Sequence, residues 1–223
     1  MIEINKPEGP ECPTCHYPLW ETPCRNCARE ERIRIASHRR METALGGRRA
    51  SQEFTPDMFQ ASPRLQPAKD AAVNFNPATD NLYFWGPAGT GKSHLAVVAA
   101  RAHYRPDSTN VRVLKPFEIA REVRIAQEAG ATEEARVIRA FIDLPILVVQ
   151  DLGSAKDTEF STSLMFEIVD GRYMDWPGGL VVTSNLRLDA LASRLGNDRI
   201  PSRLAQMAKV FSFDGEPDHR LRR

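Results

Sequence analysis

Short apolar runs alternate with helical patterns from residue 82 onward. The runs that predict β-strands are residues 82–85, 111–114, 146–149, 180–183 and 210–213. The patterns that predict helices are residues 93–104, 117–127, 133–141 and 160–174. Because strands and helices alternate along the chain, we expect an α/β fold in which helices cover both faces of a parallel sheet.

The part of the chain before residue 69 has a different character. A charged helix is predicted over residues 28–45, and Gly46-Gly47 ends it. Residues 46–68 contain three prolines and little periodicity, which is typical of a linker, with Phe54 and Phe59 as docking residues. A length of 223 residues fits one ordinary domain and a small appendage. We therefore expect a small module over residues 1–45, a linker over 46–68 and the α/β domain over 69–223.

A complete phosphate-binding loop follows the first predicted strand and begins the next helix. Its residues are Gly86, Pro87, Ala88, Gly89, Thr90, Gly91, Lys92 and Ser93. In such a loop, backbone N–H groups and the N-terminus of the helix surround the β- and γ-phosphates. Lys92 reaches the terminal phosphates, and the Ser93 hydroxyl ligates magnesium. The sequence therefore predicts binding of ATP or GTP together with magnesium.

Polar residues follow two later strands of the predicted sheet. Asp151 comes after the strand that begins at Ile146, where an acid can reach magnesium and the attacking water. Asn185 follows the next strand and is a candidate for orienting water near the γ-phosphate. Arg199 and Arg203 lie one helical turn apart and suit contact with a γ-phosphate across a subunit boundary. Taken singly, the Asn185 position is also explained by capping, and each arginine by a surface charge.

All four cysteines lie within sixteen residues and form two Cys-x-x-Cys pairs: Cys12, Cys15, Cys24 and Cys27. Two such pairs in a cytosolic chain predict a tetrahedral site of four thiolates that holds zinc, with iron as the alternative metal. Few apolar residues lie between the pairs, so the metal would supply the folding free energy that a core cannot. Four thiolates leave no open coordination position, which makes the zinc structural.

The overall charge and hydropathy of the chain say little about its binding partners. The chain has 30 Lys and Arg against 29 Asp and Glu, so local clusters must carry any argument for nucleic-acid binding. No apolar run approaches 18 residues and no signal-peptide pattern is present, so the chain is expected to be cytosolic. The most basic stretch contains Arg29, Arg32, Arg34, Arg39, Arg40, Arg48 and Arg49. It indicates either a nucleic-acid contact or a solvated helix face balanced by acids.

In this order the motifs resemble those of the AAA+ ATPases, and more closely the DnaC/DnaI-type helicase loaders and their IstB-like relatives. The resemblance covers residue 54 to the C-terminus. Besides the phosphate loop, it rests on residues 54–59, 146–153, 170–173, 183–185, 199–204 and 215–220. It implies that Asn185 senses the γ-phosphate and that Arg203, or else Arg199, is an arginine finger acting on a neighbouring subunit. A homo-oligomer built through the ATP site follows from that role.

The resemblance also implies partners. Family members carry a helical insertion that contacts single-stranded DNA, which here falls in residues 117–141, and its candidate phosphate contacts are Arg121, Arg124, Arg136 and Arg139. The cysteine module resembles the zinc-bearing helicase-binding domain of DnaI-type loaders. A bacterial loader of a hexameric replicative helicase is therefore implied. The alternatives are an IstB-like transposition helper that assembles on duplex DNA and a nucleotide-sensing helicase inhibitor of phage origin.

Two features depart from common AAA+ patterns. The family strand ends in two acids, whereas this chain has Gln150 before Asp151. An amide cannot replace the charge of a carboxylate toward Mg²⁺, so magnesium would rest on Ser93, the phosphates and Asp151, and hydrolysis is expected to be slow. The chain also ends soon after Arg220, so no helical C-terminal lid is expected.

Overall fold

The computed structural model describes residues 12–14, 16, 24–154, 157–175 and 178–219. The chain divides into two compact units, residues 1–41 and residues 42–223, and helix α1 (Arg25–Ala44) crosses the boundary between them. No described helix is both long and apolar enough to cross a bilayer. The boundaries at residues 45 and 68 stay a prediction.

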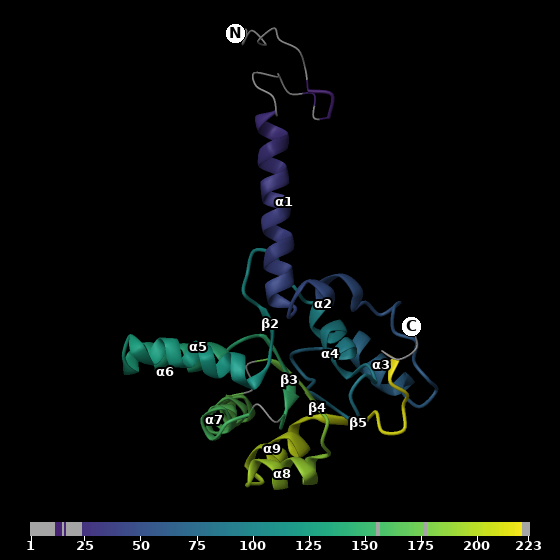
Figure 1. Ribbon diagram of the computed structural model, residues 1–223, viewed down its shortest axis with the longest axis vertical. Coiled ribbons are helices and arrows are strands. Elements are labelled where there is room, and N and C mark those ends of the chain that lie inside the picture. The colour runs from purple at the N-terminus through teal and green to yellow at the C-terminus, as the bar shows by residue number, and fades with distance from the viewer. Residues whose placement is uncertain (1–11, 15, 17–23, 155–156, 176–177, 220–223) are drawn as a thin grey trace. The chain divides into compact units, whose positions relative to one another are not determined.

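The second unit is built on five parallel strands (Figure 1). They are β1 (Leu82–Trp85), β2 (Val111–Leu114), β3 (Ile146–Leu152), β4 (Gly179–Ser184) and β5 (Lys209–Ser212). Their order in the sheet is β2-β3-β4-β1-β5, so β1, which leads into the phosphate loop, is flanked by β4 and β5, the last two of the described strands. Each predicted strand is present, and the α/β fold with a parallel sheet is confirmed.

Helices cover both faces of this sheet, as predicted. They are α2 (Arg48–Glu53), α3 (Gln66–Val73), α4 (Lys92–Arg101), α5 (Pro116–Glu128), α6 (Ala131–Ile142), α7 (Glu159–Asp175), α8 (Leu188–Leu195) and α9 (Arg199–Met207). Leu147 and Val149 of β3 belong to a buried cluster with α5 to α9. The alternate residues Ile146 and Val148 point to the opposite face, where α4 contacts β3 and β4 and is backed by α2 and α3.

Strand β3 continues past the predicted end at Val149, but not regularly. Its register with β4 shifts between Val149 and Leu152, and Asp151 takes a φ of 57°. This is the left-handed region, which aspartate tolerates better than most residues. The Asp151 N–H donates to Oγ1 of Thr183 at 3.0 Å, which fixes the irregular backbone to β4. The Asp151 carboxylate lies 2.8 Å from Nζ of Lys115, the residue that follows β2, at the carboxyl edge of the sheet.

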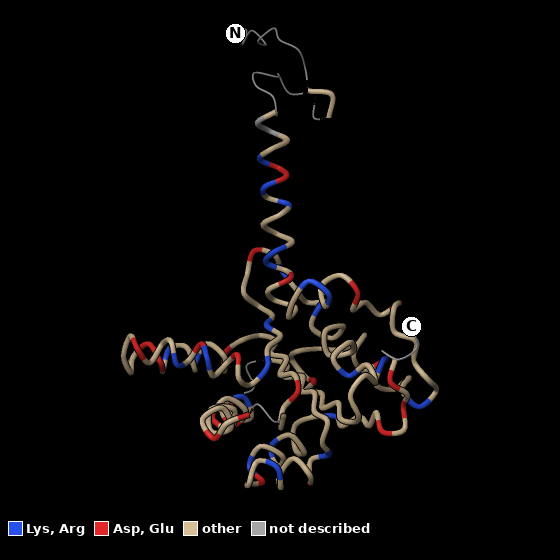
Figure 2. The backbone as a smooth tube through the Cα atoms, viewed as in Figure 1, with Lys and Arg blue, Asp and Glu red and all other residues tan. Residues whose placement is uncertain are grey.

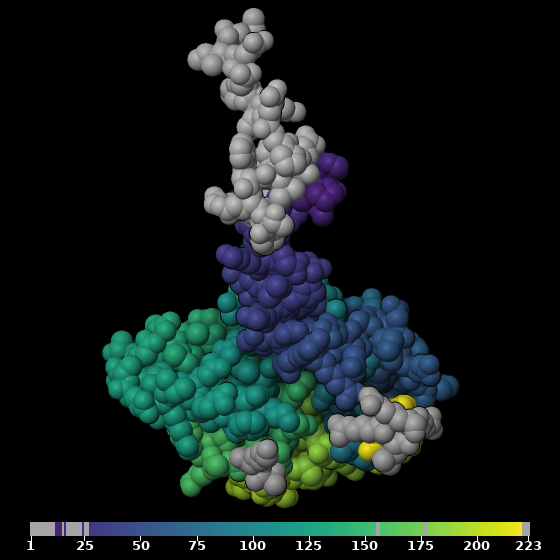
Figure 3. Space-filling model, turned by 45° about the horizontal axis from the view of Figure 1, so that its top comes forward, coloured from purple at the N-terminus to yellow at the C-terminus, as the bar shows by residue number. Residues whose placement is uncertain are grey.

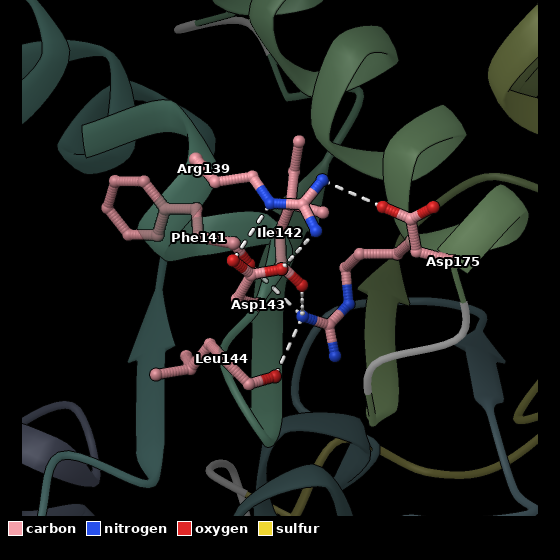
Figure 4. A network of polar contacts seen from close by, with 7 residues as sticks. Arg139, Phe141, Ile142, Asp143, Leu144 and Asp175 are labelled. Atoms are coloured by element: carbon pink, nitrogen blue, oxygen red, sulfur yellow. Dashed lines mark hydrogen bonds and ion pairs between the residues drawn. The ribbon is translucent and has the colours of Figure 1, made fainter. Parts of the chain in front are cut away.

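Arg172 of α7 is 1% exposed and links three segments of the second unit. Its guanidinium donates to the carbonyl oxygens of Phe141 (3.1 Å), Ile142 (2.7 Å) and Leu144 (2.9 Å), and to that of Gly179 (2.9 Å). The first three carbonyls end α6 and lead into β3, so they have no partners within the helix. Burial lowers the pKa of Arg172 to about 10, which still leaves it charged at neutral pH. Figure 4 shows Phe141, Ile142 and Leu144 beside the exposed ion pairs of Arg139 with Asp143 and Asp175.

Candidate nucleotide-binding site

The phosphate loop joins the end of β1, at the half-buried Trp85, to the first turn of α4. Three of its glycines have positive φ, namely Gly86 (143°), Gly89 (80°) and Gly91 (97°), which a side chain would strain. Lys92 is 5% exposed, and its Nζ donates to the carbonyl oxygens of Gly86 and Pro87, each at 2.6 Å. The Thr90 hydroxyl donates to the same Pro87 carbonyl at 2.9 Å. The loop therefore has the folded curve that its sequence predicts.

A cleft of about 690 Å³ opens beside this loop. It is lined by Arg49, Phe54, Ala88, Gly89, Gly91, Lys92, Ser93, His94, Lys115, Phe117, Asp151, Ser154, Asn185 and His219. The predicted residues Lys92, Ser93, Asp151 and Asn185 are thus brought together, because the carboxyl ends of parallel strands meet at one edge of a sheet. Gln150 is not among the described residues that line it. The Ser93 hydroxyl and the Asp151 carboxylate are oxygen donors of the kind that Mg²⁺ takes together with phosphates.

Residues upstream of the sheet form one wall of the cleft. Phe54 stacks on the His94 ring at a centroid distance of 4.8 Å, and Phe59 meets the same ring edge-on at 5.3 Å. His94 Nε2 lies 2.7 Å from the Thr55 carbonyl oxygen. Burial is the main cause that lowers the pKa of His94, against the opposing effect of the Thr55 carbonyl, and nearby Lys69 lowers it further. The two docking phenylalanines therefore contact the helix that begins at the phosphate loop.

The last described segment folds back onto the phosphate loop. The Phe213 N–H donates to the Trp85 carbonyl at 2.7 Å, and the His219 N–H donates to the Gly89 carbonyl at 3.1 Å. A Cβ added at Gly89 would overlap the Asp218 carboxylate, which would have to move, and the φ of 80° would strain any side chain at this position. His219 consequently lines the cleft. The sequence placed this segment only as part of a family resemblance, and gave no sign that it touches the loop.

The two finger candidates lie on α9, and the described residues around the cleft of their own chain do not include them. Arg203 Nε donates to Oδ1 of Asp170 at 2.8 Å, and its guanidinium lies 4.3 Å from the centre of the Tyr173 ring. Arg199 lies over the Phe166 ring at 5.1 Å and is exposed. Both arginines thus contact α7. The pairing of Arg203 with Asp170 is a feature that sequence reasoning missed.

Helices α5 and α6 contact each other and project from one side of the second unit, where acidic and basic residues intersperse (Figure 2). The space-filling view shows this pair as one continuous projection (Figure 3). Three of the four predicted DNA contacts are engaged within the chain. Arg124 lies 4.9 Å from the centre of the Phe160 ring, Arg136 pairs with Glu133, and Arg139 pairs with Asp143 and Asp175. Exposed pairs of this kind are weak, so they leave the DNA prediction open.

Three of the four predicted zinc ligands lie together in the first unit. The sulfur atoms of Cys12, Cys24 and Cys27 are within 4.8 Å of one another, and those of Cys12 and Cys27 are 3.6 Å apart. A tetrahedral shell with zinc–sulfur bonds of ~2.3 Å places its sulfurs about 3.8 Å apart. A disulfide would need about 2.05 Å. The described thiols therefore fit three corners of a zinc site, and Cys15 lies outside the described residues.

Comparison with known proteins decides the family. The sequence model described as "IstB-like ATP binding protein" matches residues 26–222, which is most of the chain. The chain belongs to this family. Its members' shared ATP-binding character agrees with the phosphate loop and the cleft, and the predicted relationship to IstB-like proteins is confirmed.

Two relatives from insertion sequences show how far the sequence likeness extends. The IS5376 ATP-binding protein of Geobacillus stearothermophilus is 26% identical over 155 residues, which cover 67% of this chain and 59% of that protein. An insertion-sequence ATP-binding protein of Sinorhizobium fredii is 29% identical over 150 residues, 66% of this chain and 59% of that protein. The chain thus spans less than two thirds of the length of these curated relatives.

Solved structures with the same fold include replication proteins. The DnaC helicase loader superposes with a TM-score of 0.59 and 24% identity, over 72% of this chain and 97% of that one. DnaI superposes with a TM-score of 0.52 and 20% identity, over 70% of this chain and 88% of that one. DnaA bound to AMPPCP and single-stranded DNA superposes with a TM-score of 0.57 and 16% identity, over 72% of this chain and 50% of that one. At these identities the likeness establishes the fold, a parallel sheet covered by helices that this chain shares with these replication proteins.

Proposed function

We propose that this chain is an ATP-dependent loader of a hexameric replicative helicase, acts in the bacterial cytoplasm and contacts single-stranded DNA. The observation that carries the proposal is the division of chemistry between the two units. The phosphate loop and its cleft belong entirely to residues 42–223, whereas the grouped thiols belong to residues 1–41. A separate metal-folded module suits partner docking, while ATP occupancy sets the state of the larger unit.

Within the larger unit we assign ATP hydrolysis to the cleft. Lys92 and the loop N–H groups hold the phosphates, and Ser93 and Asp151 hold magnesium, which would stabilise the charge of the transferring phosphate. Asn185, exposed after β4, orients water at the γ-phosphate. Gln150 supplies no carboxylate, so turnover is slow. Arg203 completes the site of a neighbouring subunit after it leaves Asp170, with Arg199 as the second candidate, and this requires a homo-oligomer.

The zinc module is tested by metal analysis of the purified chain. We expect one zinc per chain, held by Cys12, Cys15, Cys24 and Cys27, and loss of helicase binding but not of ATP binding when residues 1–45 are removed. A matched variant, Cys12→Ser with Cys24→Ser, should lose the metal and the helicase together. If the intact chain contained no stoichiometric metal, the assignment of a zinc site would be wrong.

A second candidate function is supported by the relatives from insertion sequences. In that case the chain is a transposition helper that assembles on duplex DNA and recruits a transposase. Fluorescence anisotropy with single-stranded and duplex oligonucleotides, each with ATP and with ADP, separates the two. A loader prefers the single strand and forms a complex with the purified helicase hexamer in size-exclusion chromatography. Preference for duplex DNA together with no helicase complex favours the transposition helper.

A further inference from the structure

Lys115 is a second lysine of the nucleotide cleft, besides Lys92. Its position is set by the backbone, because β2 ends at Leu114, which lies opposite Val149 at the start of the β3 bulge. The Lys115 N–H donates to the Glu118 carboxylate at 2.8 Å and so fixes the turn into α5. The side chain then reaches the cleft, where its Nζ lies 2.8 Å from Oδ2 of Asp151.

The charges in the cleft are unbalanced toward the positive side. Among its described lining residues Asp151 is the one acid, whereas Arg49, Lys92 and Lys115 are cations. Arg49 is paired with Glu53 at 2.8 Å, and Nζ of Lys92 donates to neutral carbonyls. Among the described lining residues Asp151 thus supplies the one carboxylate, and Lys115 already pairs with it. The Asp218 carboxylate lies against Gly89 of the loop but is not among these lining residues. Magnesium sites usually combine phosphates with one or two carboxylates, so this one is sparsely charged.

We propose that Lys115 is a phosphate-binding cation that performs part of the charge neutralisation usually left to Mg²⁺. ATP then binds to this chain with only a weak dependence on the metal. The Lys115 side chain is 42% exposed and flexible, so its ammonium can exchange the Asp151 carboxylate for a phosphate oxygen without moving the backbone. The carboxylate released in this exchange becomes free to ligate magnesium when the ion is present. The inference rests on the proposed binding of ATP at the phosphate loop.

The test is the ATP dissociation constant of the full chain, measured by calorimetry in excess Mg²⁺ and again in EDTA. We expect the wild type to lose less than about tenfold in affinity without the metal, since one charge-assisted contact contributes roughly that factor. Lys115→Gln should bind within a few-fold of the wild type in Mg²⁺ and lose at least about a further tenfold in EDTA. Lys115→Arg, which keeps the charge, should retain the metal-independent binding.

The matched control is Lys209→Gln. Its Nζ is likewise 2.7 Å from a carboxylate, that of Asp80, but Lys209 does not line the cleft. This control should leave both dissociation constants unchanged. If the wild type loses about a hundredfold or more of its ATP affinity in EDTA, the proposed role of Lys115 is wrong. The same conclusion follows if Lys115→Gln weakens ATP binding equally in both buffers. If the wild type fails to bind ATP even with Mg²⁺, the proposed function itself is wrong.

Discussion

At the scale of single residues, Arg172 shows how much one side chain can contribute to the stability of the fold. Removing it takes a charged donor from four carbonyl oxygens, so Arg172→Met should destabilise the second unit by roughly 3 kcal/mol or more. For a unit of this size that lowers Tm by about 6–12 °C. The measurement is thermal unfolding followed by circular dichroism.

Arg139→Ala is the matched control for that experiment. Arg139 pairs with Asp143 and Asp175 (Figure 4), and its side chain is 56% exposed. Exposed pairs contribute about 0.2–1 kcal/mol, so this variant should melt within a few degrees of the wild type. Equal losses in the two variants would contradict the structural role of Arg172.

The lowered pKa of His94 should make the free energy of unfolding depend on pH. Because its pKa in the folded chain lies below the unfolded value, the unfolded chain binds more protons as the pH falls below about 6.5. The free energy of unfolding should therefore decrease from pH 6.5 to pH 5, and His94→Gln should flatten that decrease. Urea unfolding at both pH values measures the difference. A variant with the same slope as the wild type would show that other groups cause it.

Residue-scale chemistry was predictable where a motif fixes it. The phosphate loop, Asp151 and Asn185 were found because each follows an apolar strand, and the sheet then collects strand ends at one edge. Lys115 also follows a strand and carried the same signal, although it was not singled out. The contact of Arg203 with Asp170 joins residues 33 positions apart on two helices, and no sequence pattern encodes such a pair.

At the scale of elements, the junction between β1 and the phosphate loop depends on close backbone packing. Gly86 has a φ of 143°, and a Cβ there would lie 2.8 Å from the backbone carbon of Phe213, just after β5. Gly86→Ala should therefore displace the loop, weaken ATP binding at least about tenfold and cost roughly 2 kcal/mol of stability. Calorimetry with ATP and urea unfolding check the two effects.

Gly196, which ends α8, is the control for backbone strain alone. Its φ of 71° is also left-handed, but nothing lies within 4 Å of an added Cβ. Gly196→Ala should cost about 1–2 kcal/mol and leave ATP affinity unchanged. If both alanine variants bound ATP like the wild type, the contact of Gly86 with the end of β5 would have no role in shaping the loop.

The long periodic elements were predictable and the short helices were not. Helices α2, α3, α8 and α9 have six to nine residues, too few for a strong period, and they are stabilised by packing on α4 and α7 or on each other. The extension of β3 to Leu152 was missed for another reason. A left-handed Asp151 depends on its contact with Thr183, which is distant in sequence.

At the scale of the whole molecule, the trans role of Arg203 is tested by mixing two inactive variants. Lys92→Ala should lose ATP binding, and Arg203→Ala should bind ATP but lose concentration-dependent hydrolysis, since a finger contributes roughly 10³–10⁵ in turnover where it acts. Mixed oligomers contain interfaces with one intact loop and one intact finger, so activity should partly return. A mixture that co-assembles and stays inactive, measured by phosphate release, removes Arg203 as the finger and leaves Arg199.

The strand order has a consequence for folding of the chain during its synthesis on the ribosome. β1 lies between β4 and β5, which are synthesised about a hundred residues after it or more, as the pairings of Leu82 with Val181 and with Lys209 show. Contacts so distant in sequence form late, because the loop must close before any pairing stabilises it. A nascent chain therefore lacks one of the two strands beside β1 until β5 has emerged, and the surroundings of its phosphate loop are complete only then.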